Sequence, residues 1–93
     1  MKETSYSLLG SLIRDSRLKV SLSQKGLAEL LGYSGPQFIS NWERGVSYPP
    51  TQRVSTVLEA LKISKEEYID VYLKQKEIVL KEQLNNTLGV VND

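Results

Sequence analysis

The sequence predicts an all-α protein of five helices, without β-strands. Apolar residues recur at helical spacing along most of the 93 residues, and capping serines and glycines mark where several of these runs begin and end. Hydrophobic content is 40% and charged content 25%, so most of the chain should fold, as one small unit. We expect residues 1–64 to form a four-helix domain. Residues 65–93 should add a long C-terminal helix that completes the core, followed by a short tail.

The first expected helix runs from about Ser5 to Lys19. Its apolar stripe has five members, and Tyr6 can extend it: Leu8, Leu9, Leu12, Ile13 and Leu18.

The second and third expected helices are short and lie close together in the sequence. Ser23 is a good N-cap for a helix over residues 24–31, and Gly32 should end it. Ser34 offers the next N-cap, for a helix that begins at residue 35 or 36 and stops at Gly45. When two short helices are joined by a tight turn, the second can protrude from the protein surface. A protruding helix can enter the major groove of DNA.

The fourth and fifth expected helices follow a proline pair. Pro49 and Pro50 fix an extended lead into a helix over residues 51–61. Its buried stripe should contain Val54, Val57, Leu58 and Leu61. A capping box then starts the fifth helix, which should reach residue 83 or beyond, and consists of Ser64 and Glu67.

The fifth helix is too long for so small a domain. Its first part should close the core, through Tyr68, Ile69 and Tyr72 together with Val71 or Leu73. Its second part lies about 15–25 Å further along the axis and carries Ile78, Val79, Leu80 and Leu84. An exposed apolar surface of this kind usually marks an interface, so we expect these four residues to form a homodimer contact. The alternative is a helix that folds back on its own domain or frays.

The pattern SQ…LAELLG…S…IS.WERG, followed by PP, resembles the helix-turn-helix domain of phage Cro and lambda-repressor-like proteins, the XRE family. The resemblance runs from about Leu9 to Ser64. Features that agree in register are Gln24, Ala28, Gly32, Ile39, the Glu43-Arg44-Gly45 triplet, Val54, Leu58 and Leu61. One departure is an extra residue in the turn, at Gly35-Pro36, which leaves open where the recognition helix begins.

The outward face of the third helix carries the candidate base contacts. Opposite Ile39 and Trp42, which should be buried, lie Gln37, Ser40, Asn41 and Arg44. Gln and Asn can form bidentate pairs with adenine, Arg with guanine, and Ser can bond either; a solvated polar face is the alternative.

The resemblance implies further roles. Gln24 should contact a DNA phosphate; a simple polar residue at the start of its helix is the alternative. Independently of the resemblance, we expect Ser34 and Tyr48 to contact phosphates, and for Tyr48 a plain loop residue is the alternative. Arg17 and Glu43 should form a partly buried ion pair between the first and third helices.

Composition excludes several other classes of function. The chain has neither Cys nor His, so the common zinc sites and the Ser-His and Cys-His catalytic pairs cannot be built. It has no phosphate loop or dinucleotide fingerprint, so we expect no enzyme activity, no metal and no cofactor. The N-terminus lacks the apolar run of a signal peptide and no segment is apolar enough to span a membrane, which predicts a soluble cytoplasmic protein without membrane contact.

Charge favours DNA as the partner of the first part of the chain. Net charge is only +1, but residues 1–62 carry eight Lys/Arg against five Asp/Glu, and residues 63–93 carry four against six. We expect a transcriptional regulator of bacterial or phage repressor type that binds an inverted repeat in double-stranded DNA as a homodimer. An antitoxin whose C-terminal segment covers a toxin is the second hypothesis. An interaction domain that has lost DNA binding is the third.

Overall fold

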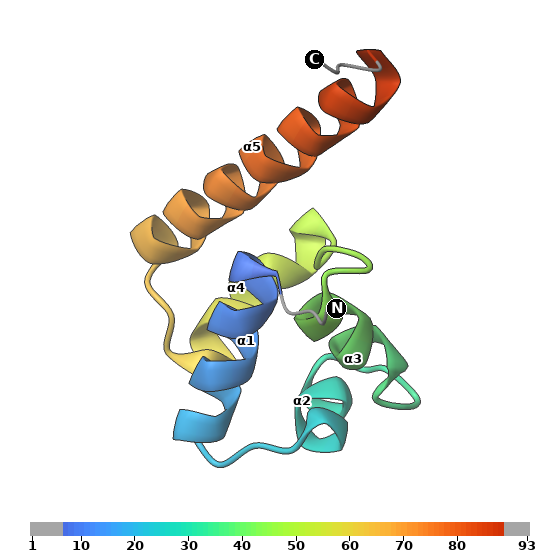
Figure 1. The fold of residues 1–93 in the computed structure, drawn as a ribbon. Coiled ribbons are helices and arrows are strands. Elements are labelled where there is room, and N and C mark those ends of the chain that lie inside the picture. The colour runs from blue at the N-terminus through green and yellow to red at the C-terminus, as the bar shows by residue number, and fades with distance from the viewer. Residues whose placement is uncertain (1–6, 89–93) are drawn as a thin grey trace.

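The computed structural model describes residues 7–88, and this part of the chain folds into five α-helices without a strand. The helices are α1 (Leu8–Lys19), α2 (Gln24–Leu30), α3 (Gln37–Arg44), α4 (Thr51–Leu61) and α5 (Lys65–Leu88). Helices α1 to α4 form one body, and the first half of α5 packs across it while the second half extends beyond it (Figure 1). The predicted all-α, five-helix fold is therefore confirmed.

The core lies where the five helices meet, and each of them contributes to it. Its largest fully buried side chains are Trp42, Ile13, Leu27, Ile39, Leu61 and Val57. Tyr68 closes the core from α5. Ala28 is completely buried, and a small residue at this place lets α2 and α3 approach closely.

Serine caps begin three of the helices. The Oγ of Ser7 accepts from the Gly10 amide at 2.7 Å, that of Ser23 from Gly26 at 2.8 Å, and that of Ser64 from Glu67 at 3.0 Å. Since Ser7 is the N-cap, α1 begins at Leu8. The expected start at Ser5, together with Tyr6, lies outside the described residues.

Helix α3 begins later than predicted, and Ser34 does not cap it. The N-cap position is occupied by Pro36, without a side-chain hydrogen bond, and the first helical residue is Gln37. Ser34 therefore lies two residues ahead of the N-cap, so its hydroxyl is not at the position from which a capping side chain accepts from the second or third helical amide. The extra turn residue is thus absorbed before the helix.

Two glycines end the helices of the predicted DNA-binding unit. Gly32 has φ +82°, and the Tyr33 amide donates back to the Ala28 carbonyl at 2.9 Å. Gly45 has φ +79°, and the Val46 amide donates to the Asn41 carbonyl at 2.9 Å. This left-handed conformation is costly for residues with a Cβ atom, so both stops depend on glycine.

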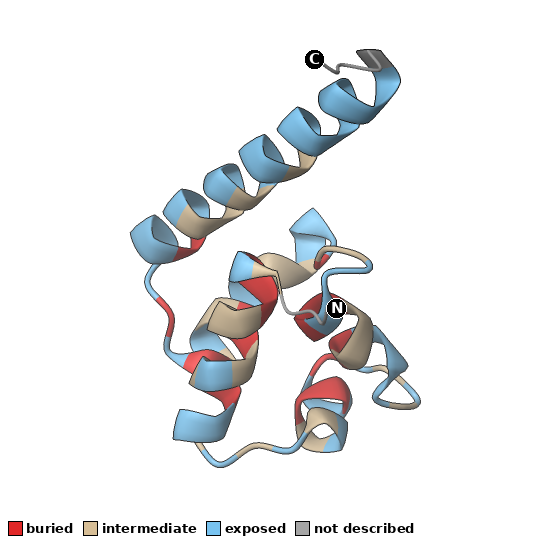
Figure 2. Cartoon of the chain, in the orientation of Figure 1, coloured by how far each residue is buried: buried red, intermediate tan, exposed pale blue. Residues whose placement is uncertain are grey.

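The helical register corrects the expected faces of α1 and α5. Leu8 and Leu18 are exposed, because they lie about 100° and 180° around α1 from the buried Leu9. Ile69 and Leu73 are also exposed and do not close the core, whereas Val71 and Tyr72 pack against it. Figure 2 shows that the outer side of α5 is exposed along its length.

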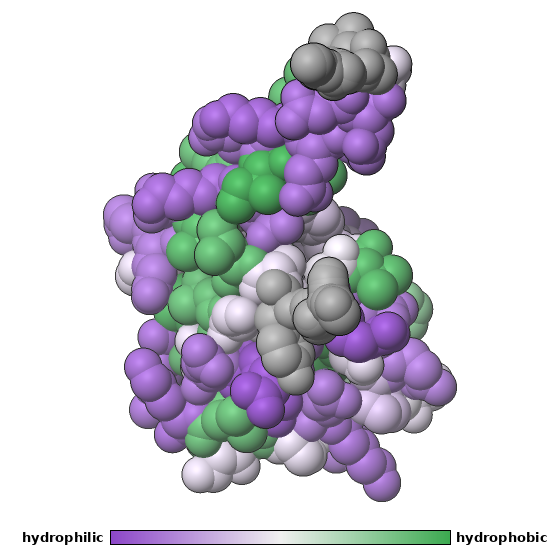
Figure 3. All heavy atoms as spheres, viewed as in Figure 1, coloured by the Kyte–Doolittle hydropathy of each residue, from purple (hydrophilic) through white to green (hydrophobic). Residues whose placement is uncertain are grey.

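The described helices give no sign of a membrane span, since none within residues 7–88 is both long and apolar enough. Apolar atoms gather instead along the junction between α5 and the body and on parts of α5 beyond it (Figure 3).

Candidate nucleic-acid interface

A buried carboxylate connects the first three helices. Arg17 donates from Nε to Glu43 Oε2 at 2.6 Å and from Nη2 to Oε1 at 3.0 Å. Gln24 donates from Nε2 to the same Oε1 at 3.0 Å. Arg17 is 7% exposed and Glu43 3%, so the ion pair expected from the sequence is present and is more deeply buried than expected.

The guanidinium of Arg17 also bonds the connection between α1 and α2. Its Nη1 donates to the Leu22 carbonyl at 2.9 Å. One side chain therefore ties α1, the connection that follows it and α3 together, while Gln24 adds α2. Charge-assisted and bidentate bonds have narrow geometry, so this cluster fixes the angle between α2 and α3.

Aromatic rings hold the turn between α2 and α3. The Tyr33 ring lies 4.5 Å from Phe38 and 6.0 Å from Trp42, centroid to centroid. Arg53 of α4 lies 5.0 Å from the Tyr33 centroid and donates to the Leu31 carbonyl at 2.6 Å. Trp42 is 2% exposed, so it is a packing residue as expected. The turn is thus supported from both sides.

The outward face of α3 forms a shallow hollow of about 320 Å³, here called the α3 hollow. It is lined by Gln24, Pro36, Gln37, Ser40, Asn41 and Arg44. The structure therefore brings together the four residues predicted to contact bases and the N-terminal glutamine of α2. Sequence separation alone did not require Gln24 to lie beside them.

Several side chains of the α3 hollow keep N–H donors that they do not use within the protein. Arg44 Nη2 donates to Asn41 Oδ1 at 2.7 Å, which leaves the Asn41 amide nitrogen and other guanidinium N–H groups available. Gln24 uses one N–H on Glu43 and keeps a second. Such groups can bond base edges and phosphate oxygens.

Two predicted phosphate contacts lie apart from this hollow. Ser34 is exposed on the turn and does not line it. The Tyr48 ring packs at 5.3 Å from Tyr72 of α5, and Lys76 Nζ lies 4.8 Å from its centroid. Burial, and then the neighbouring Tyr72, raise the pKa of the Tyr48 hydroxyl. Tyr48 is thus placed with α5.

Two residues that shape the site were not found from the sequence. Gly10 lies where α1 crosses α3, and a Cβ atom there would come within 2.1 Å of the Glu43 carbonyl oxygen. A glycine inside an amphipathic helix was the available signal. Arg53 left no such signal, because its contacts with Tyr33 and Leu31 are tertiary.

Comparison with known proteins agrees with this geometry. The helix-turn-helix family model HTH_3 matches residues 13–68, which include α2, the turn, α3 and α4. Comparisons with curated proteins and with solved structures gave no match. Two short helices with an outward polar face on the second are the arrangement with which a helix-turn-helix presents a helix to the major groove. The chain belongs to the XRE-type, Cro/C1-like helix-turn-helix family of DNA-binding domains.

Proposed function

We propose that this protein is a sequence-specific transcriptional regulator of repressor type that inserts α3 into the major groove. The main support for this proposal is the α3 hollow. It brings four side chains that can bond base edges, Gln37, Ser40, Asn41 and Arg44, next to Gln24, whose side chain is hydrogen-bonded to the buried Glu43 carboxylate. Side chains that are fixed before binding lose little entropy when they meet DNA. A regulator of this type would act in the cytoplasm of its host.

The contacts divide into base reading and backbone positioning. Gln37 and Asn41 suit bidentate bonds to adenine, Arg44 suits guanine, and Ser40 can bond either base. Gln24 has one N–H left for a phosphate oxygen. Ser34 could add a phosphate contact from the turn, which would set register without reading sequence.

A homodimer on an inverted repeat completes the proposal. One unit offers few base contacts and the chain has a net charge of only +1, so a single unit should bind weakly. Two copies can place their α3 helices in successive major grooves about 34 Å apart. The expected contact is the second half of α5, where Ile78, Leu80 and Leu84 are exposed and Val79 is half-buried.

Selection of bound sites from random duplex DNA, followed by binding measurements on the selected site, tests this proposal. Asn41→Ala and Gln37→Ala should each weaken binding by about 1–3 kcal/mol and relax the preference at one base position. Gln24→Ala should instead weaken binding to all sequences alike. Glu59→Ala, which changes an exposed residue of α4 outside the α3 hollow, is the matched control.

The outcomes separate the roles clearly. Unchanged affinity and unchanged site preference in both Asn41→Ala and Gln37→Ala would rule out base reading by α3. A change of base preference in Gln24→Ala would contradict its phosphate role. If the protein showed no salt-dependent binding to duplex DNA, the proposal that it is a DNA-binding regulator would be wrong.

An antitoxin is the second candidate, because the exposed apolar residues of α5 could equally cover a partner protein. Sedimentation of the purified chain distinguishes the two uses of this surface. A chain that stays monomeric at micromolar concentration, both free and on DNA, would favour a different protein partner over a second copy.

A further inference from the structure

The exposed apolar residues of α5 do not form the surface expected from the sequence. Ile78 lies about 160° around the helix from Leu80, and the half-buried Val79 lies on the same face as Tyr72. Four apolar positions, Leu80 among them, fall within about 60° of one another and are here called the α5 stripe. They are Ile69, Leu73, Leu80 and Leu84, which are 48%, 59%, 54% and 48% exposed. The stripe therefore runs along nearly the whole helix.

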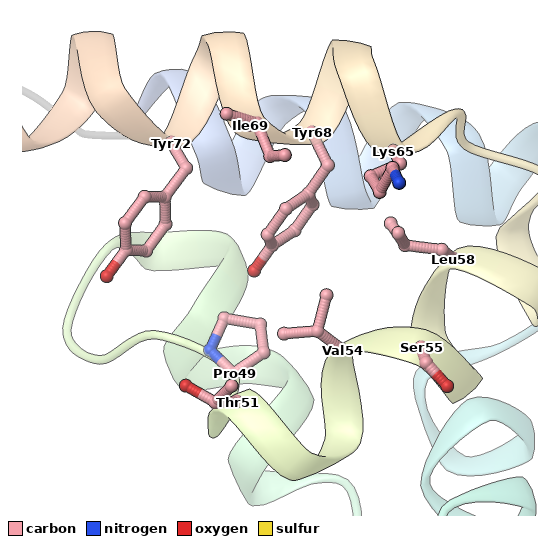
Figure 4. A pocket seen from close by; sticks show the side chains of 9 residues that line it. All are labelled: Pro49, Thr51, Val54, Ser55, Leu58, Lys65, Tyr68, Ile69 and Tyr72. Atoms are coloured by element: carbon pink, nitrogen blue, oxygen red, sulfur yellow. The ribbon is translucent and has the colours of Figure 1, made fainter.

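The stripe continues into an apolar groove between α4 and α5, here called the α4–α5 groove. Its cavity is about 450 Å³. Val54 and Leu58 form one wall, and Tyr68, Ile69 and Tyr72 form the other (Figure 4). Ile69 belongs to both surfaces, so an occupant of the groove also meets the stripe.

One buried polar atom that lines the groove has no hydrogen-bond partner among the described residues. It is the Tyr68 hydroxyl, which points between Val54 and Pro49 (Figure 4). Buried hydroxyls are nearly always bonded. An occupant should therefore bring an apolar surface together with one hydrogen-bonding group.

The intervals between successive residues of the α5 stripe are the same whether they are counted from the N-terminal or the C-terminal end. Its residues follow one another after four, seven and four positions. A second copy laid antiparallel, with its centre between residues 76 and 77, puts Leu84 opposite Ile69 and Leu80 opposite Leu73. Every apolar residue of the stripe then has an apolar partner, which satisfies the requirement of a two-fold contact that one surface complement itself.

Charges beside the stripe have a matching order. Asp70, Lys74, Glu77 and Lys81 alternate in sign along one flank. Asp70 and Lys74 form an exposed ion pair at 3.3 Å, and Glu77 and Lys81 form another at 2.9 Å. In an antiparallel pair of helices the same flanks meet in reversed order. Asp70 then lies near Lys81 of the second copy, and Lys74 near its Glu77. These opposite charges favour the antiparallel pairing of the two α5 helices and help to fix its register.

We propose that the occupant is a second copy of this chain, whose α5 lies antiparallel along the stripe and closes the α4–α5 groove with its C-terminal half. The register puts Asn85 of the second copy level with Tyr68 and Gln83 about 3 Å further along the helix, on the flank that meets the α4–α5 groove, from which its amide can reach towards the free hydroxyl. This inference rests on the dimer of the proposed function and specifies its interface. The DNA-reading face of α3 takes no part in it.

Cysteine cross-linking tests the arrangement, because the natural chain contains no cysteine. Leu73→Cys and Leu80→Cys are each made alone, with one variant carrying a mass tag, and are mixed in equal amounts under mild oxidation without DNA. The antiparallel pair predicts that mixed 73–80 disulfides exceed either self-linked species at least fivefold. Ile69→Cys mixed with Leu84→Cys should behave in the same way. Glu59→Cys, exposed on α4, is the control for random collision.

Other outcomes would overturn the inference. Self-linked Leu73→Cys and Leu80→Cys in preference to the mixed species would mean a parallel pair. Cross-linking no greater than in Glu59→Cys would mean that a second copy does not lie along the stripe. Circular dichroism confirms that each variant is folded, and since all four substituted residues are exposed, the fold should be kept.

A second measurement separates this inference from DNA binding. Leu80→Asp combined with Leu84→Asp should give a folded protein that sediments as a monomer at concentrations where the parent is a dimer. If the 73–80 cross-link forms but the parent shows no salt-dependent DNA binding, the α5 pairing stands and the regulator proposal falls. If the parent binds its selected DNA site but sediments as a monomer, the α5 pairing and the homodimer fall, while DNA reading by α3 stands.

Discussion

Replacement of Glu43 by alanine should be among the most damaging single changes in this protein. The Glu43 carboxylate accepts three hydrogen bonds, two from Arg17 and one from Gln24. Its loss leaves the Arg17 guanidinium, which is 7% exposed, without an opposite charge. Removal of one member of a buried ion pair costs about 3–5 kcal/mol, mostly from the stranded charge. That is a large share of the roughly 5–15 kcal/mol that stabilises a typical domain.

The double variant Arg17→Met with Glu43→Leu is the informative comparison. It removes both charges and restores apolar volume, so no charge is left stranded, and such replacements are often close to neutral. We expect it to be less destabilised than either Glu43→Ala or Arg17→Met alone. The two positions should therefore be strongly non-additive.

Urea unfolding followed by circular dichroism measures these free energies. The midpoint should fall in the single variants with little change in the slope, because the surface exposed on unfolding stays similar. A cost below about 1 kcal/mol for Glu43→Ala would show that the pair contributes no more than a surface salt bridge. Additive effects in the double variant would equally refute the reasoning.

Three further predictions concern packing and titration. Gly10→Ala should destabilise the fold by about 1–3 kcal/mol in the same urea assay, because the new Cβ would lie 2.1 Å from a backbone oxygen of α3. Gly26→Ala is the control and should be tolerated, because its Cβ would have nearest contacts of 3.2 and 3.3 Å, both to side-chain atoms. Trp42→Ala should cost about 3–5 kcal/mol, and a variant that melted like the parent but lost DNA binding would make Trp42 a contact residue. Burial, and then Tyr72, raise the pKa of Tyr68 from 10.0 to about 12, so stability should be complete below pH 10 and fall between pH 10 and 12, as the unfolded chain ionises first. Tyr68→Phe should flatten that part of the pH profile, and an unchanged profile would contradict the assignment.

The sequence alone determined the parts of this protein that depend on local interactions. Serine caps bond amides three residues away, and Gly32 and Gly45 stop helices through bonds that span five residues. The outward face of α3 followed from the helical period once Ile39 and Trp42 were assigned to the core. Short-range bonds and periodicity are properties of the chain itself, so the five helices and their order could be predicted.

Only the tertiary structure decided which faces are used. Helix α5 carries apolar residues on more than one side, so periodicity could not choose between Tyr68 and Ile69 as the residue that closes the core. The choice follows from how α5 lies across α1 and α4, with the Leu8 amide donating to Gln75 Oε1 at 2.7 Å. The α3 hollow, the close approach at Gly10 and the placement of Tyr48 against α5 have the same origin. Each joins residues far apart in the chain, and the energy of such contacts depends on packing geometry that no local pattern encodes.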